Sequence, residues 1–187
     1  MPRKNVFTKE QIIDTAFVIA DTEGFDQLSA RKLASALNSS VAPIYANFSD
    51  FDDLKKKVVE KINRVALDLA VQSASGNPLK DIGAASIRFA FQHPKLFHDY
   101  IFGKFAFDKQ DDMNAYVLKS IKEDEQLSQF SEAEIMEYLE KIRIYQMGLS
   151  ILAANRFAQT CSESQLVQML DDMSSDIIFS IKHKRES

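Results

Sequence analysis

Apolar residues recur at spacings of three and four along most of this chain, which is the pattern of amphipathic helices. In the first 47 residues the pattern predicts three helices, over residues 8–23, 29–37 and 41–47. Further along it predicts helices over residues 51–73, 79–92, 111–122, 131–159 and 162–181, and one that starts at residue 94 and continues to 101. The chain has only 5 Gly and 4 Pro, which favours long helices over a turn-rich sheet. We find no strand candidate and predict an all-α fold.

The ends of several predicted helices carry their own signals. Thr8-Lys9-Glu10-Gln11 and Ser131-Glu132-Ala133-Glu134 have the form of a capping box, in which the first and fourth residues bind each other's backbone N–H groups. Gly24 fits the left-handed position that ends a helix. Asn38 fits the tight turn after the second helix, because Asn tolerates left-handed backbone angles.

The third short helix has two features at its start. Ser40 is expected to be its N-cap. Pro43 then lies in the first turn, where the missing N–H of proline is not needed for a bond within the helix. Because the residue before a proline avoids helical angles, a start at Pro43 is the alternative.

The clearest break in the chain is the run Ser73-Ala74-Ser75-Gly76-Asn77-Pro78, which combines small residues with Gly and Pro. It suggests two domains. We assign residues 1–50 to a first domain of three helices, residues 51–74 to a connecting helix, and residues 75–187 to a second, helical domain.

Charge and cysteine content indicate the compartment in which the protein is expected. The net charge is −4, and residues 1–64 hold ten Lys or Arg against nine Asp or Glu, so the front of the chain is near neutral. The single cysteine, Cys161, cannot form an intramolecular disulfide, which suits a reducing compartment. We see neither a signal peptide nor a stretch of apolar residues long enough to cross a membrane. A cytoplasmic protein is expected.

A specific resemblance lies between Gln27 and Phe48. Ser29 and Arg31 open the second helix, Leu33-Ala34 follow, and Ile44-Tyr45-Ala46-Asn47-Phe48 closes the third, with Leu54 six residues on. In this pattern the chain resembles the TetR-type repressors. It departs from the family at Asn38-Ser39, where Gly-Val is usual, at Asn47, where His is usual, and at Phe51, where a Lys is common.

The resemblance implies a helix-turn-helix that binds double-stranded operator DNA, joined to a helical domain that dimerises and binds a small effector. The third helix would then enter the major groove. Arg31 is the side chain suited to a bidentate pair with guanine, and an ordinary exposed arginine or a phosphate contact is the alternative. The residues expected at the DNA are Ser29, Ala30, Arg31, Ser40, Val41, Ala42, Pro43, Tyr45, Asn47 and Lys55.

The effector is expected among the aromatic residues of the middle of the chain, where seven of 19 aromatics fall between residues 89 and 107. Small-molecule sites are mostly apolar with a few polar groups, so we favour an apolar or aromatic effector. Ordinary core packing is the alternative for most of these rings. The candidate ligand-binding residues are Phe89, Phe97, His98, Tyr100 and Phe105.

The last two long helices are expected, from the resemblance, to form a four-helix bundle in a homodimer. Each carries an apolar stripe whose alternative role is the core of its own chain. The candidate interface residues are Tyr145, Leu149, Leu166, Leu170, Met173 and Ile177.

We find no catalytic set, nucleotide-binding loop or metal-ligand spacing, and expect no enzyme activity, cofactor or metal. The function predicted from the sequence is a DNA-binding transcriptional regulator, a repressor released by its effector. The alternative is a helical interaction or ligand-binding module that has lost specific DNA binding.

Overall fold

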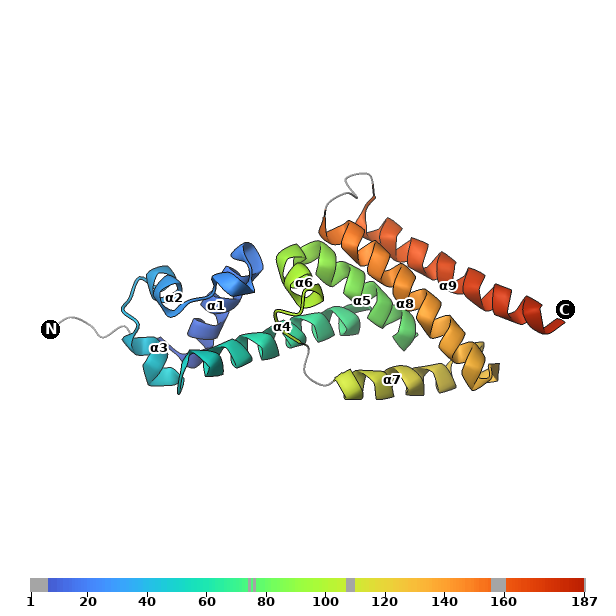
Figure 1. Ribbon diagram of the computed structural model, residues 1–187, viewed down its shortest axis with the longest axis horizontal. Helices are drawn as coiled ribbons and strands as arrows, with labels where there is room; N and C mark the ends of the chain where they lie inside the picture. Colours follow the sequence, from blue (N-terminus) through green and yellow to red (C-terminus); the bar gives the residue numbers. More distant parts are fainter. Residues whose placement is uncertain (1–6, 74, 76, 107–109, 156–160, 187) are drawn as a thin grey trace. The chain divides into compact units, whose positions relative to one another are not determined.

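The computed structural model describes residues 7–73, 75, 77–106, 110–155 and 161–186. All regular structure within these ranges is helical, which confirms the all-α prediction (Figure 1). The elements are α1 (Lys9–Glu23), the 3-10 helix η1 (Phe25–Gln27), α2 (Ala30–Ala36), α3 (Ala42–Asn47), α4 (Phe51–Ser73), α5 (Pro78–Gln92), α6 (Pro94–Ile101), α7 (Gln110–Glu123), the 3-10 helix η2 (Leu127–Gln129), α8 (Glu132–Ala154) and α9 (Glu163–Glu186).

The ends of α1 and α8 are capped as predicted. The Thr8 hydroxyl accepts the N–H of Gln11, whose side chain accepts the N–H of Thr8, and Ser131 and Glu134 make the same exchange at α8. Gly24 has φ of +108°, a backbone angle that L side chains rarely adopt, and it closes α1. Local pairing over three residues therefore sets where these helices begin.

Some boundaries differ from the predicted ones. Helix α3 starts at Ala42 with Val41 as its N-cap, and no side chain caps it, so Ser40 does not have the expected role. The Ser40 hydroxyl instead lies 3.4 Å from the N–H of Ala42. Helix α9 continues to Glu186, beyond the predicted end at residue 181. The predicted end of α8 at residue 159 lies outside the described residues.

The chain divides into two compact units. The first comprises Met1–Val65 and Lys95–Asp108, and the second comprises Ala66–Pro94 and Lys109–Ser187. Helix α4 runs without a break from one unit into the other. The predicted boundary near residue 75 placed residues 95–106 in the second domain, whereas in the structure they belong to the same compact unit as the N-terminal helices.

The first unit has a continuous apolar core built from α1, α2, α3, the start of α4, and α6. On α1 and α4 its fully buried residues are four apart, so each of these helices contributes one face. The fully buried residues include Ile12, Ala16, Leu33, Ile44, Leu54, Val58, Ile62 and Leu96, none of which exposes any side-chain surface.

In the second unit α5, α8 and α9 lie side by side (Figure 1). Helix α9 runs antiparallel to α5, because Lys80 at the start of α5 pairs with Asp171 at 3.6 Å while Arg88 near its end pairs with Glu163 at 3.0 Å. Helix α5 packs closely against α9 at Gly83, where an added Cβ would lie only 2.7 Å from the Leu170 side chain.

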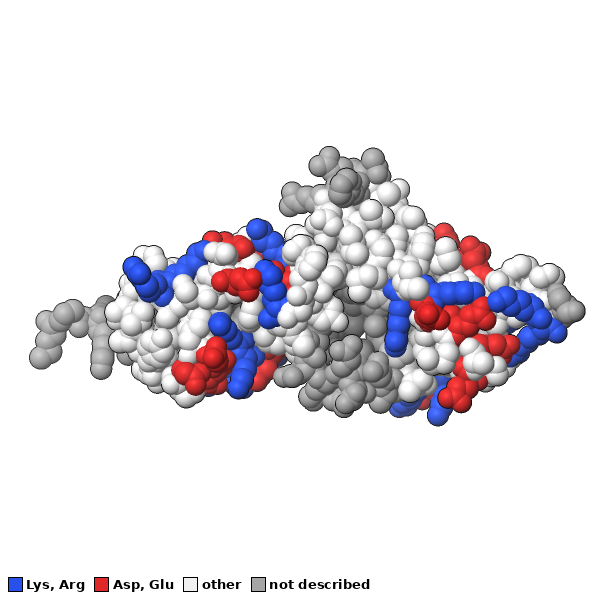
Figure 2. Space-filling model, viewed as in Figure 1, with Lys and Arg blue, Asp and Glu red and all other residues white. Residues whose placement is uncertain are grey.

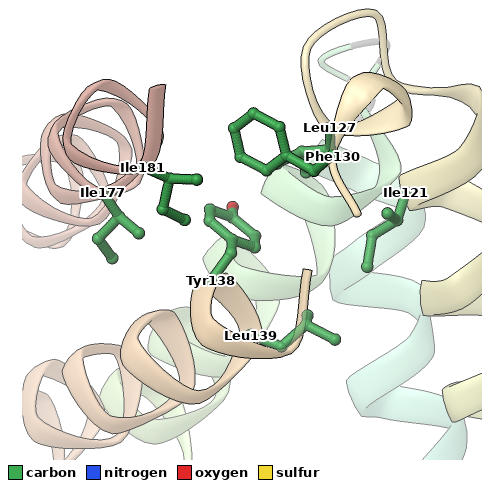
Figure 3. Packing of buried hydrophobic residues seen from close by; sticks show 7 residues of the cluster. All are labelled: Ile121, Leu127, Phe130, Tyr138, Leu139, Ile177 and Ile181. Atoms are coloured by element: carbon green, nitrogen blue, oxygen red, sulfur yellow. The ribbon is translucent and has the colours of Figure 1, made fainter. Parts of the chain in front are cut away.

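One end of the second unit contains an apolar cluster that draws on α7, η2, α8 and α9 (Figure 3). Its buried members are Ile121, Leu127, Phe130, Tyr138, Leu139, Ile177 and Ile181. Figure 3 shows the Tyr138 ring among these side chains. The hydroxyl of Tyr138 lies 2.9 Å from that of Ser174, so this buried polar group has a partner.

The same end is tied by an ion pair between the last turn of α9 and the first turn of α8. Arg185 Nε lies 2.5 Å from a Glu134 oxygen, and its guanidinium also donates to the Gln129 carbonyl at 3.0 Å. The hydrogen bonds from Arg185 and Ser131 lower the pKa of Glu134 from 4.5 to about 2. Because the folded pKa is the lower one, this pair contributes stability above pH 4.5 and loses it as the pH falls towards 2.

We expect the Glu134 side-chain carboxyl to titrate near pH 2 in the folded protein, measured by ¹³C NMR. Arg185→Ala should raise that midpoint towards 4.5, because the largest stabilising contact of the carboxylate is removed. Lys184→Ala is the matched control, since Lys184 is one residue away and pairs with Glu137 instead. An Arg185→Ala protein with an unchanged Glu134 midpoint would rule out this ion pair.

None of the helices in the described part of the chain has the length and apolar character that crossing a membrane requires.

Candidate nucleic-acid interface

The turn between α2 and α3 is closed by backbone hydrogen bonds. The N–H of Ser39 donates to Ala34 O at 2.9 Å, and that of Asn38 donates to Ser35 O at 3.0 Å. These two bonds form a Schellman motif, which requires a left-handed residue just after the helix. Asn38 supplies it with φ of +48°, as predicted. The Asn-Ser pair at 38–39 therefore makes the turn without glycine.

Helix α3 presents one face to the core and the other to solvent. Ile44 and Phe48 are buried, which fixes the helix against its neighbours. Tyr45 exposes 52% of its surface and Val41 39%, although both are apolar enough to favour burial. Ser40 and Ala42 are exposed as well, and Pro43 is half-buried. The exposed face of α3 is therefore small and mostly uncharged, and buried Ile44 and Phe48 hold the helix in place.

The start of α2 adds a positive charge. Ser29 caps the helix by accepting the Lys32 N–H at 3.3 Å. Arg31 is exposed, whereas Ala30 is half-buried. The neighbouring Lys32 pairs with Glu23 of α1. Arg31 is therefore the cation at this end of α2 whose side chain extends into solvent.

The Asn47 side chain, which was predicted to contact DNA, makes hydrogen bonds within the first unit instead. Its amide nitrogen donates to Pro43 O at 2.8 Å and to Phe7 O at 3.3 Å. An Asn amide has two N–H donors, and both are used inside the unit. The remaining oxygen only accepts hydrogen bonds and cannot pair with a phosphate. Asn47 therefore connects α3 to the segment before α1 and lacks a donor for DNA.

Lys55 lies beside Phe51. Phe51 occupies the position where the family that the chain resembles commonly has a lysine. Lys55 Nζ is 5.6 Å from the Phe51 ring centre and 3.4 Å from Asp52. Lys9 lies similarly over Phe48, at 4.9 Å. Contacts of this kind on a protein surface are weak, so both ammonium groups remain available to an anion.

Positive and negative side chains alternate over the face of the molecule shown in Figure 2. In the first unit Lys61 pairs with Asp14, and Lys57 pairs with Glu60 at 2.7 Å. Several lysines that the sequence places near the front of the chain are thus partly neutralised. Any attraction for nucleic acid depends on the local arrangement of charges and not on the net charge.

A buried carboxylate that we did not single out from the sequence connects α6 to the segment between α1 and α2. Asp99 is only 4% exposed, and one of its oxygens accepts the Phe25 N–H at 2.6 Å. The other lies 2.9 Å from Lys104 Nζ, which is 2.6 Å from Asp26. These hydrogen bonds, to Asp26 and then to Asp99, raise the pKa of Lys104 above its ordinary value.

An added Cβ at Gly24 would lie 3.3 Å from an Asp99 oxygen, so the glycine leaves room for this carboxylate. The Phe105 ring also lies 5.3 Å from that of Phe25. Asp99 and Phe25 are 74 residues apart, and no local pattern announces their contact. An acidic residue within the apolar run of α6 was the one available signal.

The five predicted effector residues are not brought together within either unit. Phe89 belongs to the second unit and the other four to the first. Phe97 and Phe105 are buried, and Phe105 packs 6.2 Å from the Tyr100 ring. His98 is exposed and lies 4.5 Å from the Phe102 ring. Core packing, the alternative interpretation, accounts for the buried rings.

Most of the predicted dimer residues face the interior of their own chain. Leu149, Leu166, Leu170 and Ile177 are buried there, while Tyr145 and Met173 are half-buried. The exposed large apolar residues of α8 and α9 are instead Met136, Ile144, Met147, Ile151, Leu152, Met169 and Phe179. The four buried residues therefore belong to the core of their own chain, which was the alternative interpretation. Another face of α8 is apolar and exposed to solvent in the single chain.

Among the residues described, no group of three or more His, Cys, Asp or Glu side chains is arranged to hold a metal ion. Comparison with protein-family models and with curated proteins finds no match to this chain.

Proposed function

We propose that this chain is a DNA-binding transcriptional regulator in which α3 enters the major groove. The observation that carries the proposal is the exposed face of α3, formed by Ser40, Val41, Ala42 and Tyr45 on a helix anchored by buried Ile44. Val41 at the N-cap and Tyr45 on the helix place apolar surface on the side of α3 that faces solvent, where a partner can contact it.

The chemistry of this face suits the edges of bases. The major groove of B-DNA admits an α-helix, and small apolar side chains contact thymine methyl groups. Arg31 at the start of α2 supplies a guanidinium, which pairs bidentately with guanine. Lys9, Lys55 and the Tyr45 hydroxyl are suited to phosphates, since such contacts position the protein without reading sequence. Asn47 is excluded from this set by its internal bonds.

The test begins with selection of a preferred duplex from random-sequence DNA, followed by fluorescence anisotropy. We expect Arg31→Ala to weaken binding of the selected duplex by about 1–3 kcal/mol, because one bidentate base contact is lost. The helical content should not change, since Arg31 is exposed.

Arg64→Ala is the control, because Arg64 is equally exposed but lies on α4, away from α3. It should leave the affinity nearly unchanged. If the selection enriches no sequence, the regulator proposal fails. Equal losses for Arg31→Ala on selected and random duplexes would assign Arg31 to the phosphates.

The second candidate is a helical interaction or ligand-binding module without specific DNA binding. The mixture of charges in the first unit favours it, because several of its lysines pair with acidic neighbours. The two candidates differ in salt dependence. A regulator that contacts several phosphates loses affinity for DNA steeply as the salt concentration rises. The interaction module should show no such steep loss, because it makes no set of phosphate contacts.

The proposal includes a dimer formed through the exposed face of α8. Ile144, Met147, Ile151 and Leu152 form an apolar stripe there, each between 41% and 69% exposed. Gly148 lies in the middle of the stripe, and an added Cβ would meet no atom within 4 Å. Glycine inside a helix costs about 1 kcal/mol relative to alanine. Since no described residue lies close enough to require a glycine here, close approach of a second helix is the reason we infer.

The stripe is also suited to pairing with itself. Ile144 and Leu152 are each four residues from Gly148. If two copies of α8 cross in antiparallel directions at Gly148, Ile144 faces Leu152 of the partner subunit. A two-fold interface must be self-complementary in this manner. Such a dimer would bind two half-sites, so the selected duplex should be a pseudo-palindrome.

A further inference from the structure

The second unit contains a groove with a volume of about 240 Å³ at the end where the apolar cluster lies. Four parts of the chain line it: the start of α5, the segment that joins α7 to η2, α8, and the last three turns of α9. None of the residues predicted to bind an effector lines it. Its volume is below the roughly 300–1,000 Å³ of sites for drug-sized ligands, so it suits a small molecule.

The floor and one edge of the groove are apolar. Leu127 and Tyr138 belong to the buried cluster in Figure 3, so this surface is fixed by the core. Ile178 packs against the same cluster. Phe179 forms part of the lining and is 72% exposed, which leaves an aromatic ring open to a ligand.

Among the described residues that line the groove, Asp124 is the one with a carboxylate, and it is already satisfied. Asp124 accepts the N–H groups of Gln126 at 2.9 Å and Leu127 at 3.0 Å with one oxygen. Its other oxygen accepts the Asn77 amide at 2.9 Å. Three donors therefore compensate its negative charge, and they hold η2 and the start of α5 in place. This carboxylate has little capacity left to bind a cation.

The ammonium group of Lys182, which lines the groove, has fewer partners than the Asp124 carboxylate. Lys182 donates to the amide oxygen of Gln126 at 3.3 Å, a neutral acceptor. Its neighbours on α9 differ, because Lys184 and Arg185 pair with Glu137 and Glu134. An ammonium group has three donors, so Lys182 retains donors for a ligand.

Three further groups on the lining suit an anion. The Ser174 hydroxyl is shared with that of Tyr138, at 2.9 Å. Burial raises the pKa of Tyr138, so its hydroxyl stays protonated at neutral pH. Lys80, paired with Asp171 at 3.6 Å, lies on the α5 side of the groove. A third hydroxyl, that of Ser175, donates to the Asp171 carbonyl at 3.0 Å. The lining therefore combines two ammonium groups and three hydroxyls with the compensated carboxylate of Asp124.

We propose that this groove binds a small organic monocarboxylate. The carboxylate lies at Lys182, within reach of the Ser174 hydroxyl, and the apolar body of the ligand rests on Ile178 and Phe179. This assignment is independent of DNA binding, because all lining residues belong to the second unit. Its failure and the failure of the regulator proposal are therefore separate results.

The experiment uses the full chain and three probes of matched design. Benzoate has both the charge and the apolar body, benzamide has the same shape without the charge, and acetate has the charge without the ring. NMR chemical shifts of Ile178 and of the Phe179 ring report binding. We expect benzoate to bind in the millimolar range, at least tenfold more tightly than either benzamide or acetate.

Lys182→Ala should weaken benzoate binding at least tenfold, the effect expected for one lost charge-assisted hydrogen bond. Lys184→Ala is the control, because it removes a similar charge from the same helix but outside the groove. It should change the affinity less than twofold. Absence of benzoate binding at millimolar concentrations, equal binding of benzamide, or equal effects of the two lysine variants would each overturn the proposal.

Discussion

Ile144→Asp is expected to separate the proposed dimer into monomers at micromolar concentration. Ile144 is 69% exposed in the single chain and lies in the apolar stripe around Gly148. Burying its exposed surface is worth about 1–2 kcal/mol per copy. A symmetric dimer contains two copies, so the substitution removes about 2–4 kcal/mol, and a carboxylate then adds the cost of its desolvation. At 1.4 kcal/mol for each tenfold, the dissociation constant should rise at least about a hundredfold.

Sedimentation velocity over a range of concentrations measures this change. Leu118→Asp is the matched control, because Leu118 is 50% exposed but lies on α7, away from the stripe. It should leave the dimer intact. A wild-type protein that is monomeric at tens of micromolar would refute the dimer, and an Ile144→Asp protein that still dimerises would move the interface elsewhere.

Gly148→Leu separates dimerisation from folding. Leucine favours a helix more than glycine does, so this variant should raise or preserve the stability of the monomer. The added side chain would nevertheless hold a second helix away from α8. Weaker dimerisation together with unchanged or higher helical stability is the expected pair of results. If Gly148→Leu dimerises as tightly as the wild type, the helices do not approach each other closely at this position.

Asp99→Ala is expected to lower the free energy of unfolding of the first unit by about 3 kcal/mol. The substitution leaves the buried Phe25 N–H without its acceptor, and a buried donor without a partner costs about 1–3 kcal/mol. It also removes a charge-assisted bond to Lys104. Urea unfolding followed by circular dichroism measures the stability, and hydrogen exchange of the Phe25 amide reports the local effect.

Asp26→Ala is the control for this variant, because Asp26 pairs with the same lysine but is exposed. Exposed ion pairs are worth about 0–1 kcal/mol, so its effect should be small. The Phe25 amide should exchange faster only in Asp99→Ala. Equal exchange in the two variants would show that the buried carboxylate does not protect that amide.

Local signals in the sequence were sufficient for much of the fold. The caps at Thr8 and Ser131 involve residues three apart, and the turn at Asn38 depends on one backbone angle, so each is readable without the rest of the chain. The same holds for the exposed face of α3, since Ile44 and Phe48 mark its buried side.

Two features were not readable in this way. Helix α8 has apolar residues on more than one side, so periodicity alone did not decide whether Leu149 or Ile151 faces the core. The bond between Asp99 and Phe25 joins residues far apart in the chain, and a helical pattern specifies no distant partner. The predicted effector residues are divided between the two units, and aromatic density indicates burial as readily as it indicates a ligand site.

The first unit is made of two separate segments of the chain, so it cannot be moved into another protein as one continuous piece. A fragment that ends after α4 would lack Asp99 and Phe105, and Phe25 would lose both its acceptor and its aromatic neighbour. Such a fragment should be less stable than its four α-helices suggest. A chimera that grafts the N-terminal unit onto another domain should therefore carry two separate stretches of sequence, and simple recombination at the end of α4 should give less stable proteins.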